Sequence, residues 1–230
     1  MLLGLCLALP ACGQASSDAT AMLRPGDLLF QETDGHALGE AIKAVTEGVD
    51  GAKFTHVGIV ATAGDLSTVV EAGGKGVKVT PLAAFLARSK DDHGRPKVVV
   101  GRLKAQFRSA AEPSVKRALA LVGTPYNDEF LLDNGKYYCS QLVYECFRDG
   151  SGKRLFEVFP MTFRAPGATQ PVKAWQDYFD KKGKPIPEGK PGCNPGALSR
   201  SANIEIIHAF GKPTGWTEEE YLRHIRPMPR

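Results

Sequence analysis

Residues 133–147 read DNGKYYCSQLVYECF, a turn followed by the pattern of an amphipathic helix. The first three residues predict the turn, and the apolar residues at 142, 143, 146 and 147 fall on one face of a helix over residues 139–147. Cys139 is therefore expected at a helix N-terminus, where the positive end of the helix dipole favours a thiolate. That environment suits a nucleophile, but a free cysteine is more commonly a buried structural residue. Position alone leaves both interpretations open.

Hydrophobic periodicity on either side of this helix predicts the fold class. It predicts strands at residues 28–31, 54–61, 68–72, 77–79, 97–103 and 203–210, and further helices at 36–47, 81–87, 114–122, 172–179 and 218–225. The strands come mainly in the first half of the chain, and hairpin-type turns such as GGKG at 73–76 join some of them. This order predicts an α+β fold with a mainly antiparallel sheet packed against helices.

Length and composition limit the classes of protein. A chain of 230 residues with 43% hydrophobic and 23% charged residues suits one folded domain with an extension. We expect a single domain over 23–230, with a catalytic core at 24–150 and a C-terminal extension at 151–230. The net charge is +4 without a dense basic run, which argues against a nucleic-acid partner. No CxxC or HExxH motif occurs, and GGKG lacks the phosphate-loop spacing, so neither a metal nor a cofactor is expected.

The first residues have the character of a targeting segment. Residues 1–12, MLLGLCLALPAC, predict a signal peptide ending in a lipobox, with Cys12 as the lipidated residue. Residues 13–22 would then be a flexible tether. No Lys or Arg precedes the apolar run, and ordinary secretion with cleavage near Ala15 is the alternative. Both interpretations predict export, to the periplasmic side of the cell envelope with a lipid anchor in the membrane, or as a secreted soluble protein.

A base for Cys139 is sought among the histidines. In FTHVGIV (54–60), strand alternation puts His56 and Gly58 on the same side, and the missing side chain predicts a face left open beside the imidazole. Glu71 ends the next strand, from which a carboxylate can reach the histidine and fix its tautomer. The more common alternatives are a hydrogen-bonded core histidine and a solvent-facing glutamate.

Two further cysteines lie in the body of the chain. Cys146 shares the apolar face of its helix and is expected in the core. Cys193 lies in a predicted loop, where it either pairs with Cys146 or stays free. Three cysteines after the targeting segment leave at least one thiol without a partner in the chain.

Five short motifs, taken in order, resemble one protein family. They are PGDLLFQ (25–31), THVGIV (55–60), VEA with GVKVTPL (70–72 and 76–82), GTPY (123–126) and YYCSQLVY (137–144). Together they are similar to the YiiX/YebB-like branch of the NlpC-type cysteine hydrolases.

That resemblance implies a circularly permuted papain-like fold in which the histidine strand precedes the cysteine helix. It also implies roles for particular residues, with Cys139 as nucleophile, His56 as base and Glu71 as its orienting partner. Tyr137 or Tyr138 would line the site. The resemblance assigns no role to residues 150–196.

The expected function is an exported thiol hydrolase that cleaves an amide or ester bond through an acyl-enzyme. A lipid acyltransferase with the same triad and a non-catalytic binding lipoprotein are the alternatives. Relatives outside this branch cleave cell-wall peptides, which favours an amide, whereas a lipid substrate is favoured if the apolar stretch LFEVFPMTF (155–163) lines the site. A charged cell-wall peptide instead requires a carboxylate or an arginine beside Cys139.

Overall fold

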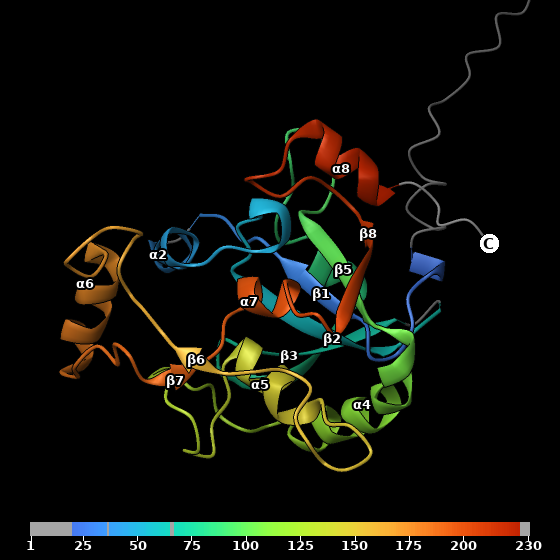
Figure 1. Ribbon diagram of the computed structural model, residues 1–230, viewed down its shortest axis with the longest axis horizontal. Helices are drawn as coiled ribbons and strands as arrows, with labels where there is room; N and C mark the ends of the chain where they lie inside the picture. The colour runs from blue at the N-terminus through green and yellow to red at the C-terminus, as the bar shows by residue number, and fades with distance from the viewer. Residues whose placement is uncertain (1–19, 36, 65–66, 226–230) are drawn as a thin grey trace, which may run out of the picture.

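The computed structural model describes residues 20–35, 37–64 and 67–225. Its centre is an antiparallel sheet of six strands in the order β4-β3-β2-β1-β5-β8 (Figure 1). The strands are β1 (Leu28–Gln31), β2 (His56–Thr62), β3 (Thr68–Gly73), β4 (Gly76–Pro81), β5 (Val98–Leu103) and β8 (Ile204–Ala209). Each predicted strand is present with its ends shifted by no more than two residues, so the predicted α+β class with an antiparallel sheet is confirmed.

The predicted helices are also present, together with short elements that were not predicted. The helices are α2 (Ala37–Val45), α3 (Leu82–Leu86), α4 (Ala111–Ala120), α5 (Cys139–Cys146), α6 (Lys173–Lys182), α7 (Pro195–Ser199) and α8 (Glu218–Ile225). Two 3-10 turns, η1 (Val49–Gly51) and η2 (Ala105–Ala110), and a small sheet of β6 (Phe159–Pro160) and β7 (Pro191–Gly192) complete the described elements. α4 begins before the predicted Ser114, because Pro113 is tolerated in the first turn of a helix.

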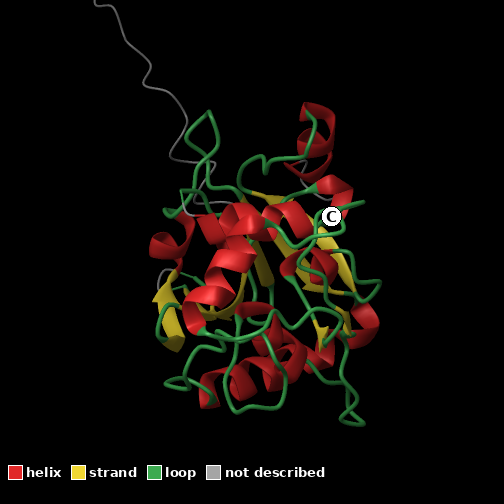
Figure 2. Cartoon of the chain, turned by 90° about the vertical axis from the view of Figure 1, so that its left-hand side faces the viewer, coloured by secondary structure: helices red, strands yellow, loops and turns green. Residues whose placement is uncertain are grey.

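Helices cover both faces of the sheet, and Figure 2 shows them outside the strands. Successive strand residues point to opposite faces, so β1, β2 and β3 contribute apolar side chains to two layers. α4 and α5 cover one face, where the buried residues include Phe30, Val57, Ile59, Val70, Leu142 and Val143. α3 covers the other, where they include Leu29, Val60, Val69, Leu82 and Phe85.

The segment from β6 to β7 forms a lobe at one end of the molecule, with α6 beside α2 (Figure 1). Trp175, Phe163 and Phe179 of the lobe are buried in an aromatic cluster that also includes Phe130 and Tyr138. The Trp175 indole N–H donates to the carbonyl oxygen of Ala41 in α2 at 3.1 Å. This contact joins the lobe to the N-terminal part of the chain.

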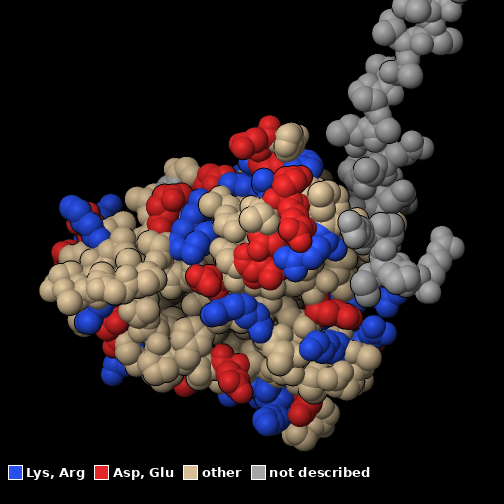
Figure 3. All heavy atoms as spheres, turned by 45° about the horizontal axis from the view of Figure 1, so that its top comes forward, with Lys and Arg blue, Asp and Glu red and all other residues tan. Residues whose placement is uncertain are grey.

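Charged side chains of both signs are interspersed over the face shown in Figure 3, in keeping with the small net charge. Within residues 20–35, 37–64 and 67–225, no helix has both the length and the apolar character needed to cross a bilayer. The predicted signal peptide with Cys12, and the predicted tether up to residue 19, lie outside the described residues.

Candidate active site

Cys139 is the first residue of α5, as the sequence predicts. The residue before it, Tyr138, is extended, and its backbone N–H donates to Oε1 of Gln141 at 3.4 Å. The side-chain amide of Asn127 donates to the same oxygen at 2.8 Å, which ties the preceding loop to the start of the helix. Cys139 is 7% exposed, and its backbone N–H belongs to the first turn, where helical N–H groups have no intrahelical acceptor.

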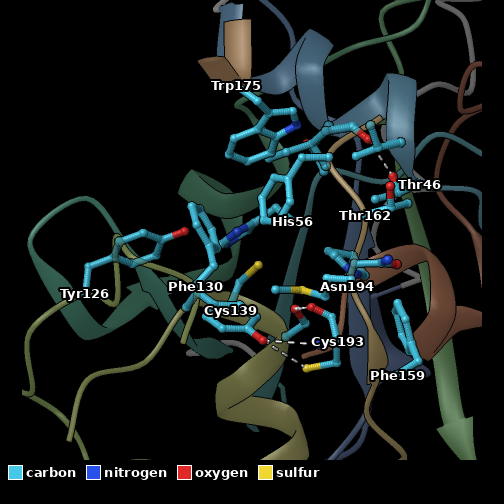
Figure 4. Close-up of a pocket in the computed structure, with 18 residues that line it drawn as sticks. Thr46, His56, Tyr126, Phe130, Cys139, Phe159, Thr162, Trp175, Cys193 and Asn194 are labelled. Carbon is cyan, nitrogen blue, oxygen red and sulfur yellow. Dashed lines mark hydrogen bonds between the residues drawn. The ribbon is translucent and has the colours of Figure 1, made fainter. Parts of the chain in front are cut away.

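His56 and Glu71 are held together beside this cysteine. Nε2 of His56 lies 2.6 Å from Oε2 of Glu71, and the sulfur of Cys139 points to the imidazole (Figure 4). Because Glu71 accepts from the Nε2–H group, Nδ1 is the ring nitrogen left to exchange a proton with the thiol. The three residues predicted to form the catalytic set therefore meet, although they come from β2, β3 and α5.

The Glu71 carboxylate is fully buried and receives several hydrogen bonds. The hydroxyl of Thr80 donates to Oε1 at 2.6 Å, and the two terminal guanidinium nitrogens of Arg88 donate to both carboxylate oxygens, Nη1 to Oε2 at 2.6 Å. Burial alone would raise the pKa of Glu71, but the hydrogen bonds from Arg88 and His56 outweigh it and hold the pKa well below its usual range. Glu71 is thus an anion rather than the solvent-facing residue of the alternative interpretation.

The imidazole of His56 carries a proton at neutral pH. Burial lowers its pKa, but hydrogen bonding and charge interactions with Cys139 and Glu71 outweigh burial and raise the pKa from 6.5 to about 9. A charged ring between a thiol and a carboxylate favours a thiolate–imidazolium pair. This is the arrangement of a nucleophile with an acid that can protonate a leaving group.

The prediction of an open face beside His56 is wrong. A Cβ atom on Gly58 would lie 2.4 Å from Cγ1 of Val69 and 2.9 Å from Cε2 of Phe85, so side chains of the protein fill that space. The Phe85 ring packs beside the imidazole, with 5.8 Å between the ring centroids. Gly58 therefore admits the ring that supports His56, and substrate does not approach from that side.

A cavity of about 100 Å³ opens beside Cys139 and His56 (Figure 4). Among the described residues, no Asp, Glu, Lys or Arg lines it. Of the apolar stretch at 155–163, Phe159, Met161 and Phe163 line the cavity, whereas Leu155 and Phe156 pack in the core. The apolar lining residues are Ile42, Val45, Phe130, Phe159, Met161, Phe163, Trp175 and Pro195.

Three tyrosines lie near the nucleophile in sequence or in space. Tyr138 lines the cavity, and its hydroxyl accepts a hydrogen bond from the backbone N–H of Cys193 at 3.1 Å. Tyr137 is not among the lining residues. Tyr126, the last residue of GTPY, has no role predicted from the sequence. The Tyr126 hydroxyl points toward the site (Figure 4). Within the described chain, that hydroxyl has no hydrogen-bond partner.

Cys146 and Cys193 are free thiols, as is Cys139. Cys146 lies in the core as predicted, and Cys193 lines the cavity, so the two do not pair. Burial raises the pKa of each of these two thiols to about 12. The part of the chain that the structure describes contains no group of three or more His, Cys, Asp or Glu side chains placed to hold a metal ion.

The sequence assigns no role to Arg88 or Thr80. Arg88 begins RSKDD (88–92), which has the composition of a solvated loop, and Thr80 lies in the motif GVKVTPL (76–82) without a sign that it contacts Glu71. Only the packing of β4 and the turn after α3 against Glu71 makes them part of the site.

Comparison with known proteins shows the family of the chain. Residues 22–208 match the model of a family described as permuted papain-like amidase enzymes, YaeF/YiiX, C92 family. The uncharacterized protein YiiX of Escherichia coli K12 is 27% identical over 132 residues, which is 57% of this chain and 61% of that protein. The crystal structure described as metalloprotein YiiX from Escherichia coli O157:H7 has the same fold, with a TM-score of 0.64 and 22% identity over 82% of this chain and 98% of that chain. The resemblance stated from the motifs is confirmed, and the chain belongs to the YaeF/YiiX family of permuted papain-like amidases.

Proposed function

We propose that the protein is a cysteine amidase that transfers an apolar acyl group from an amide to Cys139 and then to water. The observation that carries this proposal is the thiol of Cys139 facing a charged His56 at the mouth of an apolar cavity. Family membership supports the amidase reaction in its coarse form.

The reaction proceeds in two halves. The Cys139 thiolate attacks the amide carbonyl carbon, and the resulting oxyanion accepts hydrogen bonds from the Cys139 backbone N–H and the unpartnered Tyr126 hydroxyl. The His56 imidazolium then protonates the amine as the C–N bond breaks. In the second half, neutral His56 removes a proton from water as that water attacks the thioester, and cleavage of the C–S bond releases the acid and restores the thiolate–imidazolium pair.

The cavity favours an apolar acyl group. Burial of each methylene group stabilises a complex by about 0.8 kcal/mol, which corresponds to about a fourfold gain in affinity. A cavity of roughly 150 Å³ lined by Leu, Ile and Phe is large enough for benzene, so about 100 Å³ beside Cys139 suits a short acyl chain or a small apolar side chain.

The same cavity argues against a charged cell-wall peptide as the substrate. A carboxylate-bearing peptide needs an arginine or another cation in the pocket, since an unpaired charge is costly to bury. Apart from His56, whose proton the reaction uses, the described lining residues include no cation and no carboxylate for that pairing. An apolar amide is therefore the better candidate.

The test is to measure kcat/KM for fluorogenic amides of acetic, butyric, hexanoic and dodecanoic acid, with a charged cell-wall tetrapeptide in parallel. We expect kcat/KM to rise about fourfold per methylene until the cavity is full, and then to level off. Turnover of the tetrapeptide alone would contradict the acyl preference. No turnover of any amide or ester would contradict the hydrolase itself.

A matched pair of variants assigns the preference to the cavity. Phe159 lines it and is partly exposed, whereas the neighbouring Val158 does not line it. Phe159→Asp should abolish the gain with chain length, while Val158→Asp should keep it. The acyltransferase alternative is tested in the same assay by adding an amine acceptor, because accumulation of the new amide instead of the acid would favour transfer.

A further inference from the structure

The Glu71 carboxylate receives two positively charged partners at once. Nε2 of His56 reaches one oxygen, and the guanidinium of Arg88 reaches both. We propose that Arg88 is a positioning residue for the pair formed by His56 and Glu71. It holds the Glu71 carboxylate in the orientation that receives the His56 N–H, and it limits how strongly Glu71 stabilises the charged ring. This inference rests on the proposed function only where its test measures turnover.

The geometry of the contact explains why an arginine is required. A guanidinium is planar and forms two parallel N–H···O bonds with a carboxylate, so it fixes the plane of that carboxylate. Thr80 donates to Oε1 at 2.6 Å, which leaves Oε2 directed at His56. Lys78 lies 3.7 Å from Oε1 with a side chain that is 52% exposed, and a flexible ammonium group imposes no plane.

The same turn of chain supports both members of the pair. Arg88 follows α3 by two residues, and its guanidinium carbon lies 5.0 Å from the centroid of the Phe85 ring. Phe85 in turn packs beside the His56 imidazole. Its carbonyl oxygen accepts from the side-chain amide of Gln31 at 2.7 Å, which ties the turn to β1. The end of α3 therefore supports the ring through Phe85 and the carboxylate through Arg88.

The charges around His56 have opposing effects on its proton. Glu71 from β3 and the Cys139 thiolate from α5 stabilise the imidazolium. Arg88 after α3 and the more distant Lys78 on β4 pair with Glu71 and oppose it. The other ionisable groups that line the site, the Tyr126 and Tyr138 phenols and the Cys193 thiol, all have a pKa raised chiefly by burial, so they stay neutral. Without Arg88, the full charge of Glu71 would act on His56.

The experiment is an NMR titration of the His56 ring in the full chain, with His56→Gln to assign the signal. Replacement of Arg88 by Met should raise the titration midpoint of His56 by about one pH unit. A nearby positive charge disfavours the protonated ring, and the replacement removes that charge. Arg88→Lys keeps the charge and loses the planar contact. It should therefore leave the midpoint within a few tenths of a unit and lower kcat by about tenfold, with KM unchanged, since misplacement of a catalytic group acts on the chemical step.

The controls separate positioning from folding. Lys78→Met removes a cation near the same carboxylate without removing a planar contact, so its shift should be less than half of that in Arg88→Met. A folded Arg88→Met protein with the wild-type His56 midpoint would show that Arg88 only stabilises the fold. If Arg88→Met does not fold, wild-type turnover by Arg88→Lys would overturn the positioning role. Lack of turnover by the wild-type protein would contradict the proposed function, and the titration would still test Arg88.

Discussion

Three free thiols lie in the described chain, and their surroundings give them different chemistry. Cys139 faces the charged His56 ring, whereas Cys193 lines the same cavity beside the Tyr138 hydroxyl and Cys146 lies in the core. Both Cys139 and Cys193 line the cavity, so access to the cavity does not distinguish them. The charge of the His56 ring beside Cys139 does.

We expect iodoacetamide at pH 7 to modify Cys139 at least tenfold faster than either other thiol. Burial raises the pKa of Cys146 and of Cys193 to about 12, so both remain protonated and unreactive. Peptide mapping by mass spectrometry after short exposure gives the three rates. The His56→Ala protein is the control, because Cys139 should lose most of its advantage there. Equal rates at Cys139 and Cys193 in the wild type would contradict the assignment of the nucleophile.

The proton on His56 also makes stability depend on pH. Its pKa is raised from 6.5 to about 9 in the folded protein, so the folded state binds this proton more tightly than the unfolded state. The resulting stability is fully present below about pH 6.5 and is lost as pH rises through about 9. We expect the difference in Tm between wild type and His56→Gln to be largest at pH 6 and to shrink by pH 10. A difference that stays constant over this range would show that the ring is not protonated on folding.

At the scale of elements, the site depends on how closely β2 approaches β3 and α3. Gly58 lies where these three elements meet, and no Cβ atom fits there without movement of Val69 or Phe85. Local hydrophobic patterns reveal the elements but not this contact, because Phe85 lies 27 positions further along the chain.

Gly58→Ala should lower the free energy of unfolding by about 1–3 kcal/mol, the usual cost of overpacking a core. It should also reduce turnover, because the Phe85 ring that packs beside His56 must move. Urea unfolding and kcat measure the two effects. Gly150→Ala is the matched control, since a Cβ at Gly150 meets nothing within 4 Å. A Gly58→Ala protein as stable and active as this control would contradict the packing argument.

The longer elements, and the three residues that meet around Cys139, could be predicted because their signals are local. Strand alternation, helix periodicity and the motifs around His56, Glu71 and Cys139 each occupy a few consecutive residues. The two-residue strands β6 and β7 have too few positions to show a period. Arg88 and the cavity could not be predicted, because Arg88 joins Glu71 across 17 positions and the lining residues come from segments between Ile42 and Pro195.

For the whole molecule, the proposed membrane anchor depends on Cys12. A lipidated N-terminal cysteine would hold the folded domain at the membrane, with residues 13–22 between them as a short polar tether.

We expect Cys12→Ser to move the protein from the membrane fraction to the soluble fraction and to abolish labelling by a radioactive fatty acid. The isolated soluble variant should keep wild-type kcat, because the substitution leaves Cys139, His56 and Glu71 unchanged. Cys6→Ser is the control for a cysteine in the same leader, and it should remain in the membrane fraction. A wild-type protein that is already soluble, with its N-terminus near Ser16, would favour ordinary secretion.

The lobe between β6 and β7 supplies Phe159, Met161, Phe163 and Trp175 to the cavity, and none of its side chains hydrogen-bonds to His56 or Glu71 among the contacts described. On the proposed function, the groups that break the bond and this part of the acyl cavity would therefore come from different stretches of the chain. Replacement of this one contiguous segment would reshape the cavity, which Ile42, Val45, Phe130 and Pro195 also line, without altering Cys139, His56 or Glu71. Such a division would let one reaction serve several substrates, since substitutions in the lobe leave those three residues untouched.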